Sequence, residues 1–380
     1  MIDAATAPPP TGPTDAPEET EAPPRRRRWW PWIVFIVVAV AVSVAARVDL
    51  NYYAVQPGVA QSVQQFIHVP PSKGHPVTHP VLLTDVEIGR VSALSYLYYK
   101  LQGDTDFYSV ASVTGGTPPS EQGAQGALEM SQAESYAKTA ALRRLGYTVS
   151  AIPAGAVVAA TYAGTPAYAA VNVGDVITAV DGTPTLTADA LLVQLRKYHA
   201  GDTITLTVKA GGTGAPKPVP VTLRTTRIDV GGGQFQTVTL GLQVEDQINF
   251  IYPFPISIDV ANIGGPSAGL AMTLGVIDEL TGGSLTGGHT IAATGTIDQQ
   301  GDVGDVGGVP QKTVAVENAG ATVFLVPPQE LAAARSKQKP GLQIYAVSTL
   351  DQALAVLAAH GGTVPPAPSA TPSTTPAVAG

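Results

Sequence analysis

Apolar residues are distributed unevenly along the 380-residue chain, and one long uncharged apolar run extends from Trp29 to Ala46. As a helix with a rise of about 1.5 Å per residue, this run is roughly 27 Å long, close to the hydrocarbon thickness of a bilayer. Four arginines at 25–28 precede the run, as expected on the cytoplasmic side of a membrane span. Tryptophans stand at its start, as expected at the headgroup interface. The pattern predicts a single-pass transmembrane helix over residues 29–46 in the cell membrane, with a cytoplasmic N-terminus and an extracytoplasmic remainder.

A cleaved signal peptide is the alternative to a retained anchor. Ser43, Val44 and Ala45 provide small residues at the spacing that a signal peptidase recognises. The apolar run is longer than the usual core of a signal peptide, which favours the anchor. Both interpretations place the C-terminal bulk of the chain outside the cytoplasm.

Beyond the apolar run, short β-like and helical patterns alternate. Residues 50–80 are irregular and contain several prolines. Apolar residues at helical spacing predict a helix over 124–145, which Gly146 would end. Other runs predict strands over 81–91, 92–101, 202–209 and 237–244, and helices over 188–198 and 266–280. The mixture indicates an α+β protein.

Composition divides the chain further. Residues 1–28 and 363–380 are rich in proline, alanine and threonine with little that could pack, so both are predicted to be disordered tails. Between the helix and the second tail we expect an extracytoplasmic region over 47–145, a β-rich domain over 146–228 and a further domain over 229–362, which a run of glycines opens.

Charge and residue counts exclude several classes of function. The net charge of −8 argues against a nucleic-acid partner. The absence of cysteine excludes disulfides, thiolate metal sites and a cysteine nucleophile. No phosphate-binding glycine-rich loop is present, so we expect no ATP and no other cofactor. His75 and His79 have no third ligand close in the sequence, so we expect no metal site.

The middle of the chain carries a recognisable order of motifs. Gly174-Asp175-Val176-Ile177 is followed by Asp181-Gly182, the predicted helix and the predicted closing strand. This order resembles a bacterial PDZ domain, although the usual Gly-Leu-Gly-Phe loop is absent. The resemblance implies that an extended peptide is added beside a strand edge, at a loop formed by Gly155, Ala156 and Val157.

Ser267 is the strongest candidate for a nucleophile. It lies in the segment 264–269, whose other residues are too small to crowd it. Without cysteine or a well-placed histidine, Lys312 is the best available base. A lysine acts as a base near neutral pH only if burial lowers its pKa from about 10.4, and the apolar residues beside Lys312 suit such a pocket.

Three motifs follow in order: Gly-Pro-Ser-Ala-Gly at 265–269, Ala-Thr-Gly-Thr-Ile-Asp at 293–298 and Gly-Gly-Val-Pro-Gln-Lys at 307–312. This succession resembles the proteolytic domain of the Lon family of serine peptidases. With the anchor and the PDZ-like unit, the chain resembles the membrane-anchored, PDZ-containing Lon-like proteases of bacteria. Gly264 departs from ATP-dependent Lon, which often has an acidic residue at this position.

The resemblance implies a role for each matching residue. Ser267 would be the nucleophile, Lys312 the general base and Thr294 the group that holds the lysine. Backbone N–H groups near Gly265, at the start of the predicted helix, are candidates to bind the oxyanion. The resemblance also implies polypeptide substrates, a homo-oligomer of six chains, and a PDZ-like unit inserted within the protease fold. Residues 80–145 would then form the first half of that fold; otherwise they are a separate small domain.

Two other functions compete with an ATP-independent, extracytoplasmic Ser–Lys endopeptidase. The pattern Gly265-x-Ser267-x-Gly269 also fits the nucleophile elbow of a lipase or esterase, which requires a later histidine; His289 and His360 are the choices. A catalytically silent, membrane-tethered module that binds peptides through the PDZ-like domain is the other alternative.

Overall fold

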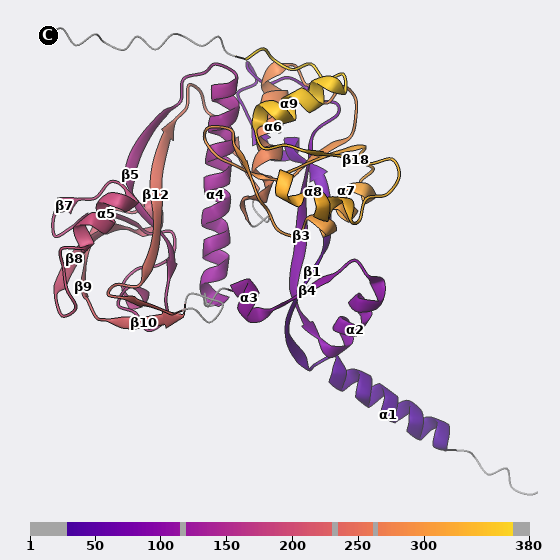
Figure 1. The fold of residues 1–380 in the computed structure, drawn as a ribbon, viewed down its shortest axis with the longest axis horizontal. Helices are drawn as coiled ribbons and strands as arrows, with labels where there is room; N and C mark the ends of the chain where they lie inside the picture. The colour runs from indigo at the N-terminus through magenta and orange to yellow at the C-terminus, as the bar shows by residue number, and fades with distance from the viewer. Residues whose placement is uncertain (1–28, 115–118, 230–234, 261–264, 368–380) are drawn as a thin grey trace, which may run out of the picture.

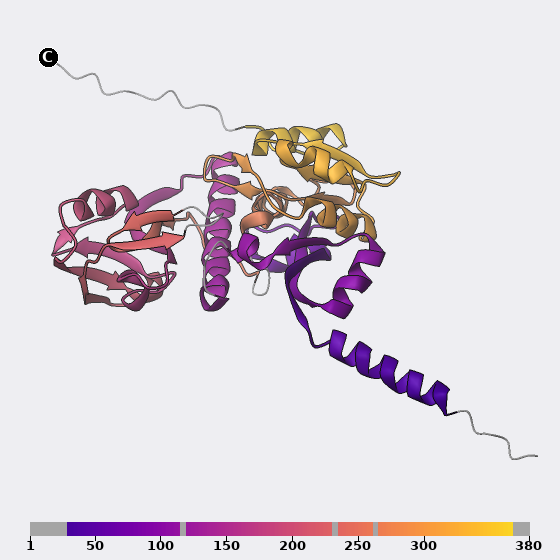
Figure 2. The same ribbon diagram turned by 60° about the horizontal axis from the view of Figure 1, so that its bottom comes forward.

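The structure is a computed structural model that describes residues 29–114, 119–229, 235–260 and 265–367. The long helix α4 (Pro119–Arg144) runs between two folded parts in both views (Figures 1 and 2). A β-rich domain lies on one side of α4. An α+β domain, built from the strands before α4 and from the C-terminal third of the chain, lies on the other side.

One sheet unites the two ends of the described chain in the α+β domain. Its strand order is β18 (Gln343–Ala346), β17 (Val323–Val326), β14 (Ile291–Ala293), β3 (Leu82–Ser92), β1 (Asp49–Ser62) and β4 (Asp106–Ser109). The C-terminal strands are parallel, the N-terminal strands are antiparallel, and β14 joins them by pairing in parallel with β3. The β-rich domain is therefore an insertion in the sequence between two halves of one sheet.

Helices α4 and α6 (Gly269–Thr281) form the centre of this domain. Residues 269–278 of α6 are all buried, as expected for a helix that is apolar on every side. Helix α4 contributes small buried residues, including Ala137 and Ala141, which allow α6 to approach closely. The remaining helices of this domain are α7 (Val309–Asn318), α8 (Leu331–Arg335) and α9 (Leu350–Ala359). The predicted helices over 124–145 and 266–280 are confirmed, with slightly different ends.

The β-rich domain is a sheet covered by one helix. The strand order is β12 (Leu242–Ile251), β5 (Ser150–Thr161), β6 (Val176–Val180), β8 (Thr203–Lys209) and β9 (Pro216–Thr222). Helix α5 (Ala188–Leu195) is capped by Thr187, whose hydroxyl accepts a hydrogen bond from Ala190 N. Buried Val158, Ile177, Leu191 and Leu206 form its core.

Two expectations for the N-terminal part are wrong. Residues 50–80 are not irregular throughout, because β1 spans 49–62 and absorbs Pro57 at a shift in its register with β3. The run over 92–101, rich in tyrosine and leucine, forms helix α2 (Ala93–Gln102) rather than a strand. Ser92 and Ser95 form a reciprocal cap at its start, and Gly103 with φ 80° ends it. These local signals outweigh the β propensity of tyrosine.

The predicted membrane span contains helix α1 (Trp30–Ala45), which has 16 residues and buries none of them. Within the described residues, no helix is both long and apolar enough to cross a membrane. The predicted tail over 1–28, and residues 368–380 of the other tail, lie outside the described residues.

The packing of α6 makes a first prediction. Leu274 is fully buried in the core that α4 and α6 share. Its truncation in Leu274→Ala should lower the free energy of unfolding by ~2–5 kcal/mol, because the cavity cannot fill completely. Urea denaturation followed by circular dichroism measures this change. Leu186→Ala, at an exposed position of the β-rich domain, should change it far less; equal effects would contradict the assigned core.

Candidate active site

Ser267 lies at the start of the central helix. It occupies a single helical turn, Pro266–Ala268, directly before α6, and it is half-buried. Gly265, before this turn, has φ 91° and no neighbouring atom that a Cβ would meet. The backbone conformation, and not lack of space, therefore favours glycine there. Pro266 has no N–H, so the N–H groups of Gly265 and Ser267 are the ones available to an oxyanion at this turn.

Lys312 lies on α7 and reaches toward the same place from the other side of the sheet. Its side chain is only 2% exposed. Gly308, with φ 69°, begins α7, and its carbonyl accepts the hydrogen bond from Lys312 N. A Cβ on Gly308 would lie 2.8 Å from Val86 Cγ1. Glycine at 308 thus allows the start of α7 to pack closely against β3.

Thr294 connects the two residues. Lys312 Nζ donates a hydrogen bond of 3.1 Å to Thr294 Oγ1. Thr294 Oγ1 in turn donates one of 3.2 Å to the carbonyl oxygen of Ser267, which also accepts from Gly295 N. Because the single hydroxyl proton of Thr294 goes to Ser267, its oxygen can only accept from the lysine. The amine is therefore fixed by one N–H bond, and its lone pair is available when it is neutral.

Burial lowers the pKa of Lys312 from 10.5 to about 8, while Asp85 and Glu330 oppose this shift. The cause is desolvation, which disfavours the ammonium form. Within the described part of the chain, no carboxylate forms an ion pair with Lys312. Asp85 and Glu330 therefore raise its pKa by less than burial lowers it. An amine with this pKa is partly neutral near pH 7–8 and can accept a proton.

Ser267 and Lys312 line one cavity of about 530 Å³. Among the described residues, no hydrogen bond joins the side chains of Ser267 and Lys312 directly. The two residues share the cavity, and Thr294 bonds to both of them. The cavity walls are mainly apolar and come from β1, β3, β4, the short helix α3 (Val110–Thr114) and the loop before α7: Val55, Val86, Ile88, Tyr108, Val113 and Val306. The sequence reasoning missed the strand residues of this wall. Val86 and Ile88 alternate on one face of β3, and that alternation was the available signal.

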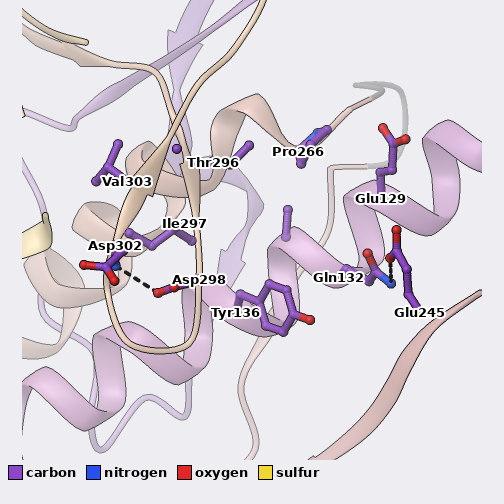
Figure 3. Close-up of a pocket in the computed structure, with 12 residues that line it drawn as sticks. Glu129, Gln132, Tyr136, Glu245, Pro266, Thr296, Ile297, Asp298, Asp302 and Val303 are labelled. Carbon is purple, nitrogen blue, oxygen red and sulfur yellow. Dashed lines mark hydrogen bonds between the residues drawn. The ribbon is translucent and has the colours of Figure 1, made fainter. Parts of the chain in front are cut away.

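A second cavity of about 420 Å³ adjoins the first, because Pro266 and Thr296 line both. Figure 3 shows Glu129, Gln132 and Tyr136 of α4 on one side and the loop carrying Asp298 and Asp302 on the other. Gln132 Nε2 donates to Glu245 of β12 over 3.0 Å. Burial, and the nearby charge of Glu245, raise the pKa of Glu129. The two cavities together thus extend past Ser267, and the second is more polar and lined by acidic side chains.

The residues predicted to form the peptide-binding loop lie elsewhere. Gly155, Ala156 and Val157 are inside β5, where β12 pairs with one edge and β6 with the other. They are therefore strand residues, and β5 has no free edge there for a peptide. The resemblance to a PDZ domain implied a loop here, but β5 continues through these residues, with a register shift between Pro153 and Gly155.

The histidines of the esterase alternative do not approach Ser267. The rings of His289 and His360 contact each other, with centroids 5.6 Å apart. Neither histidine lines either of the two cavities at Ser267. Lys312, rather than a histidine, is the basic side chain in the cavity with the serine.

Two family models and several curated proteins match parts of this chain. Residues 260–359 match the family model of the Lon protease (S16) C-terminal proteolytic domain, and residues 143–215 match that of the PDZ domain. Lon protease 2 of Bacillus subtilis is 35% identical over 117 residues, which cover 30% of this chain and 20% of that protein. Lon protease of Haemophilus influenzae is 36% identical over 93 residues, which cover 24% and 11%.

Among solved structures, the PDZ domain of the SdrC-like protein from Listeria monocytogenes matches at 21% identity and a TM-score of 0.18, covering 22% of this chain and 87% of that one. The chain spans a fifth or less of the length of the two Lon proteases. A Lon-type proteolytic domain and a PDZ domain are thus present, and the proteolytic domain indicates a serine peptidase.

The lowered pKa of Lys312 makes the reactivity of Ser267 pH-dependent. A fluorophosphonate probe should label Ser267 at a rate that rises about tenfold per pH unit below pH 8 and levels off above it, because only the neutral amine accepts the proton. Labelling followed by mass spectrometry measures the rate. A rate that stays flat from pH 6 to pH 9 would contradict the assignment of Lys312 as base.

Thr294 should act by positioning Lys312. Thr294→Val keeps the volume but removes the hydroxyl, so the amine loses its hydrogen-bond partner and labelling of Ser267 should slow by about 10²-fold. Thr313→Val is the matched control, because Thr313 is equally buried and bonds only to its own helix. If both variants slow labelling equally, the effect is structural and not positional.

Proposed function

We propose that this chain is an ATP-independent serine endopeptidase that cleaves unfolded or exposed polypeptide segments with a Ser267–Lys312 dyad. The observation that carries the proposal is the buried amine of Lys312, held by Thr294 in the cavity that Ser267 also lines. Burying a lysine without an ion pair lowers the stability of a fold, and such residues cluster at functional sites. The matched proteolytic domain supports the same interpretation.

The proposed reaction follows from the positions of these groups. Ser267 Oγ attacks the carbonyl carbon of the scissile peptide bond while Lys312 Nζ accepts its proton. The backbone N–H groups of Gly265 and Ser267 stabilise the oxyanion of the tetrahedral intermediate. Lys312 then gives the proton to the leaving amine, and the acyl group remains on Ser267. Lys312 next activates a water molecule, which hydrolyses the ester and restores the enzyme.

The two adjoining cavities support a polypeptide substrate that binds in an extended form. One cavity is apolar and holds the dyad, and the other continues past Pro266 and Thr296 toward acidic groups. The sequence contains no phosphate-binding loop that would mark an unfolding motor. The substrates proposed are therefore chains that are already unfolded or carry flexible segments.

The PDZ domain would present or regulate substrate in this proposal. Its edge strand β12 continues toward the segment that carries Ser267, and α4 contacts both domains. By resemblance to membrane-anchored Lon-like proteases, we also propose a homo-oligomer of six chains and an extracytoplasmic proteolytic domain. Attachment to the cell membrane is supported by α1, whose apolar side chains are exposed on all sides.

Degradation of casein tests the proposed activity. The full chain should cleave casein without ATP, and Ser267→Ala and Lys312→Met should each reduce the rate by at least ~10³-fold. Lys337→Met is a matched control, because Lys337 does not line the cavity with Ser267 and bonds instead to Gly103 and Asp104. Gel electrophoresis and mass spectrometry of the fragments follow the reaction.

The outcomes separate the candidate functions. Activity that survives Lys312→Met would overturn the dyad. Absence of cleavage by the unmodified chain, together with specific binding of extended peptides, would favour the catalytically silent PDZ module.

A further inference from the structure

Helix α2 presents an apolar stripe that no described part of the chain covers. Leu94, Leu97, Tyr98 and Leu101 follow one another at the spacing that places residues on one face of a helix. All four are exposed; Leu97 and Tyr98 are each 57% exposed and Leu101 is 80% exposed. Leu101 thus has most of its surface in solvent in this structure, where it gains nothing from the fold.

The opposite face of α2 explains why the helix is fixed in place. The ring of Tyr96 packs against Phe107 of β4, with centroids 4.4 Å apart, and approaches Tyr52 of β1. The reciprocal cap of Ser92 and Ser95 fixes the first turn. The aromatic face holds α2 on the sheet, and the stripe is therefore available for a partner outside the fold.

The position of α2 identifies that partner. Ala93 N donates a 2.9 Å hydrogen bond to the carbonyl of Val48, three residues beyond the end of α1. Helices α1 and α2 also contact each other, and both views place them together at the end of the molecule distant from the PDZ domain (Figures 1 and 2). An apolar helix such as α1 requires apolar surroundings, and the stripe of α2 begins where α1 ends.

We propose that α2 is a second membrane-contact element, which lies in the boundary between headgroups and acyl chains of a lipid bilayer. This inference rests on the membrane attachment through α1 proposed above. The leucines of the stripe would enter the acyl region, while the hydroxyl of Tyr98 remains among the headgroups. Lys100 is an exposed residue whose Nζ lies 5.6 Å from the centre of the Tyr96 ring, and its ammonium group would also remain among the headgroups.

Contact with lipid at α2 would also reach the candidate active site. The strands that hold α2, β1 and β4, contribute Val55 and Tyr108 to the wall of the cavity with Ser267. The bilayer would therefore fix the tilt of these strands and the distance of the cavity from the membrane surface.

The absence of cysteine makes a direct test possible. Full-length Leu101→Cys, labelled with an environment-sensitive fluorophore, is reconstituted in vesicles of phosphatidylcholine with a minority of phosphatidylglycerol. Its emission should shift to the blue, and lipids with a spin label high in the acyl chain should quench it. Val38→Cys on α1 reports whether the anchor enters the bilayer. Leu192→Cys, exposed on α5 of the PDZ domain, is the control and should be quenched several-fold less.

Each outcome decides the inference. Quenching at positions 38 and 101, but not at 192, supports contact of α2 with lipid. Quenching at 38 alone overturns the inference but leaves the anchor intact. Absence of quenching at both overturns the membrane attachment as well. A blue shift at 101 that lipid does not quench, and that disappears on dilution, shows that a second copy of the chain covers the stripe.

Discussion

The candidate active site depends on burying the amine of Lys312 without giving it a counter-ion. Burial alone disfavours the ammonium form, and the nearby carboxylates of Asp85 and Glu330 restore it only in part. A direct ion pair would raise the pKa and remove the base, whereas complete isolation would penalise the folded state more strongly. The hydroxyl of Thr294 avoids both extremes, because it fixes the amine and carries no charge.

This arrangement requires parts of the chain that are distant in sequence. Ser267 lies in the turn directly before α6, Lys312 lies on α7, and the apolar wall comes mainly from strands near the N-terminus. The pairing of Ala292 with Leu82 unites them in one sheet. The sequence between those strands can therefore accommodate a whole domain, since the ends of the insertion are held by α4 and β12.

Strand β12 has a double role in this architecture. It completes the sheet of the PDZ domain by pairing along β5 and then leads into the α+β domain. Its Glu245 also bonds to Gln132 of α4, beside the second cavity at the active site. Because β12 pairs along this edge of β5, the edge is not open to a peptide that would bind as an added strand.

The sequence by itself identified the candidate catalytic residues and the long local elements. Ser267, Thr294 and Lys312 could be chosen from their motifs, and α4 and α6 from helical periodicity, because small residues around a nucleophile and a repeating apolar face are local properties. Only the tertiary structure decided that 50–62 form a strand, that 93–102 form a helix, and that 155–157 are enclosed between two strands. It also decided which strands line the cavity of Ser267, since partners separated by many residues leave no local signal. The burial of Lys312 was predicted from its apolar neighbours in the sequence and is seen in the tertiary structure. Its lowered pKa depends on the whole fold, which excludes solvent from the amine.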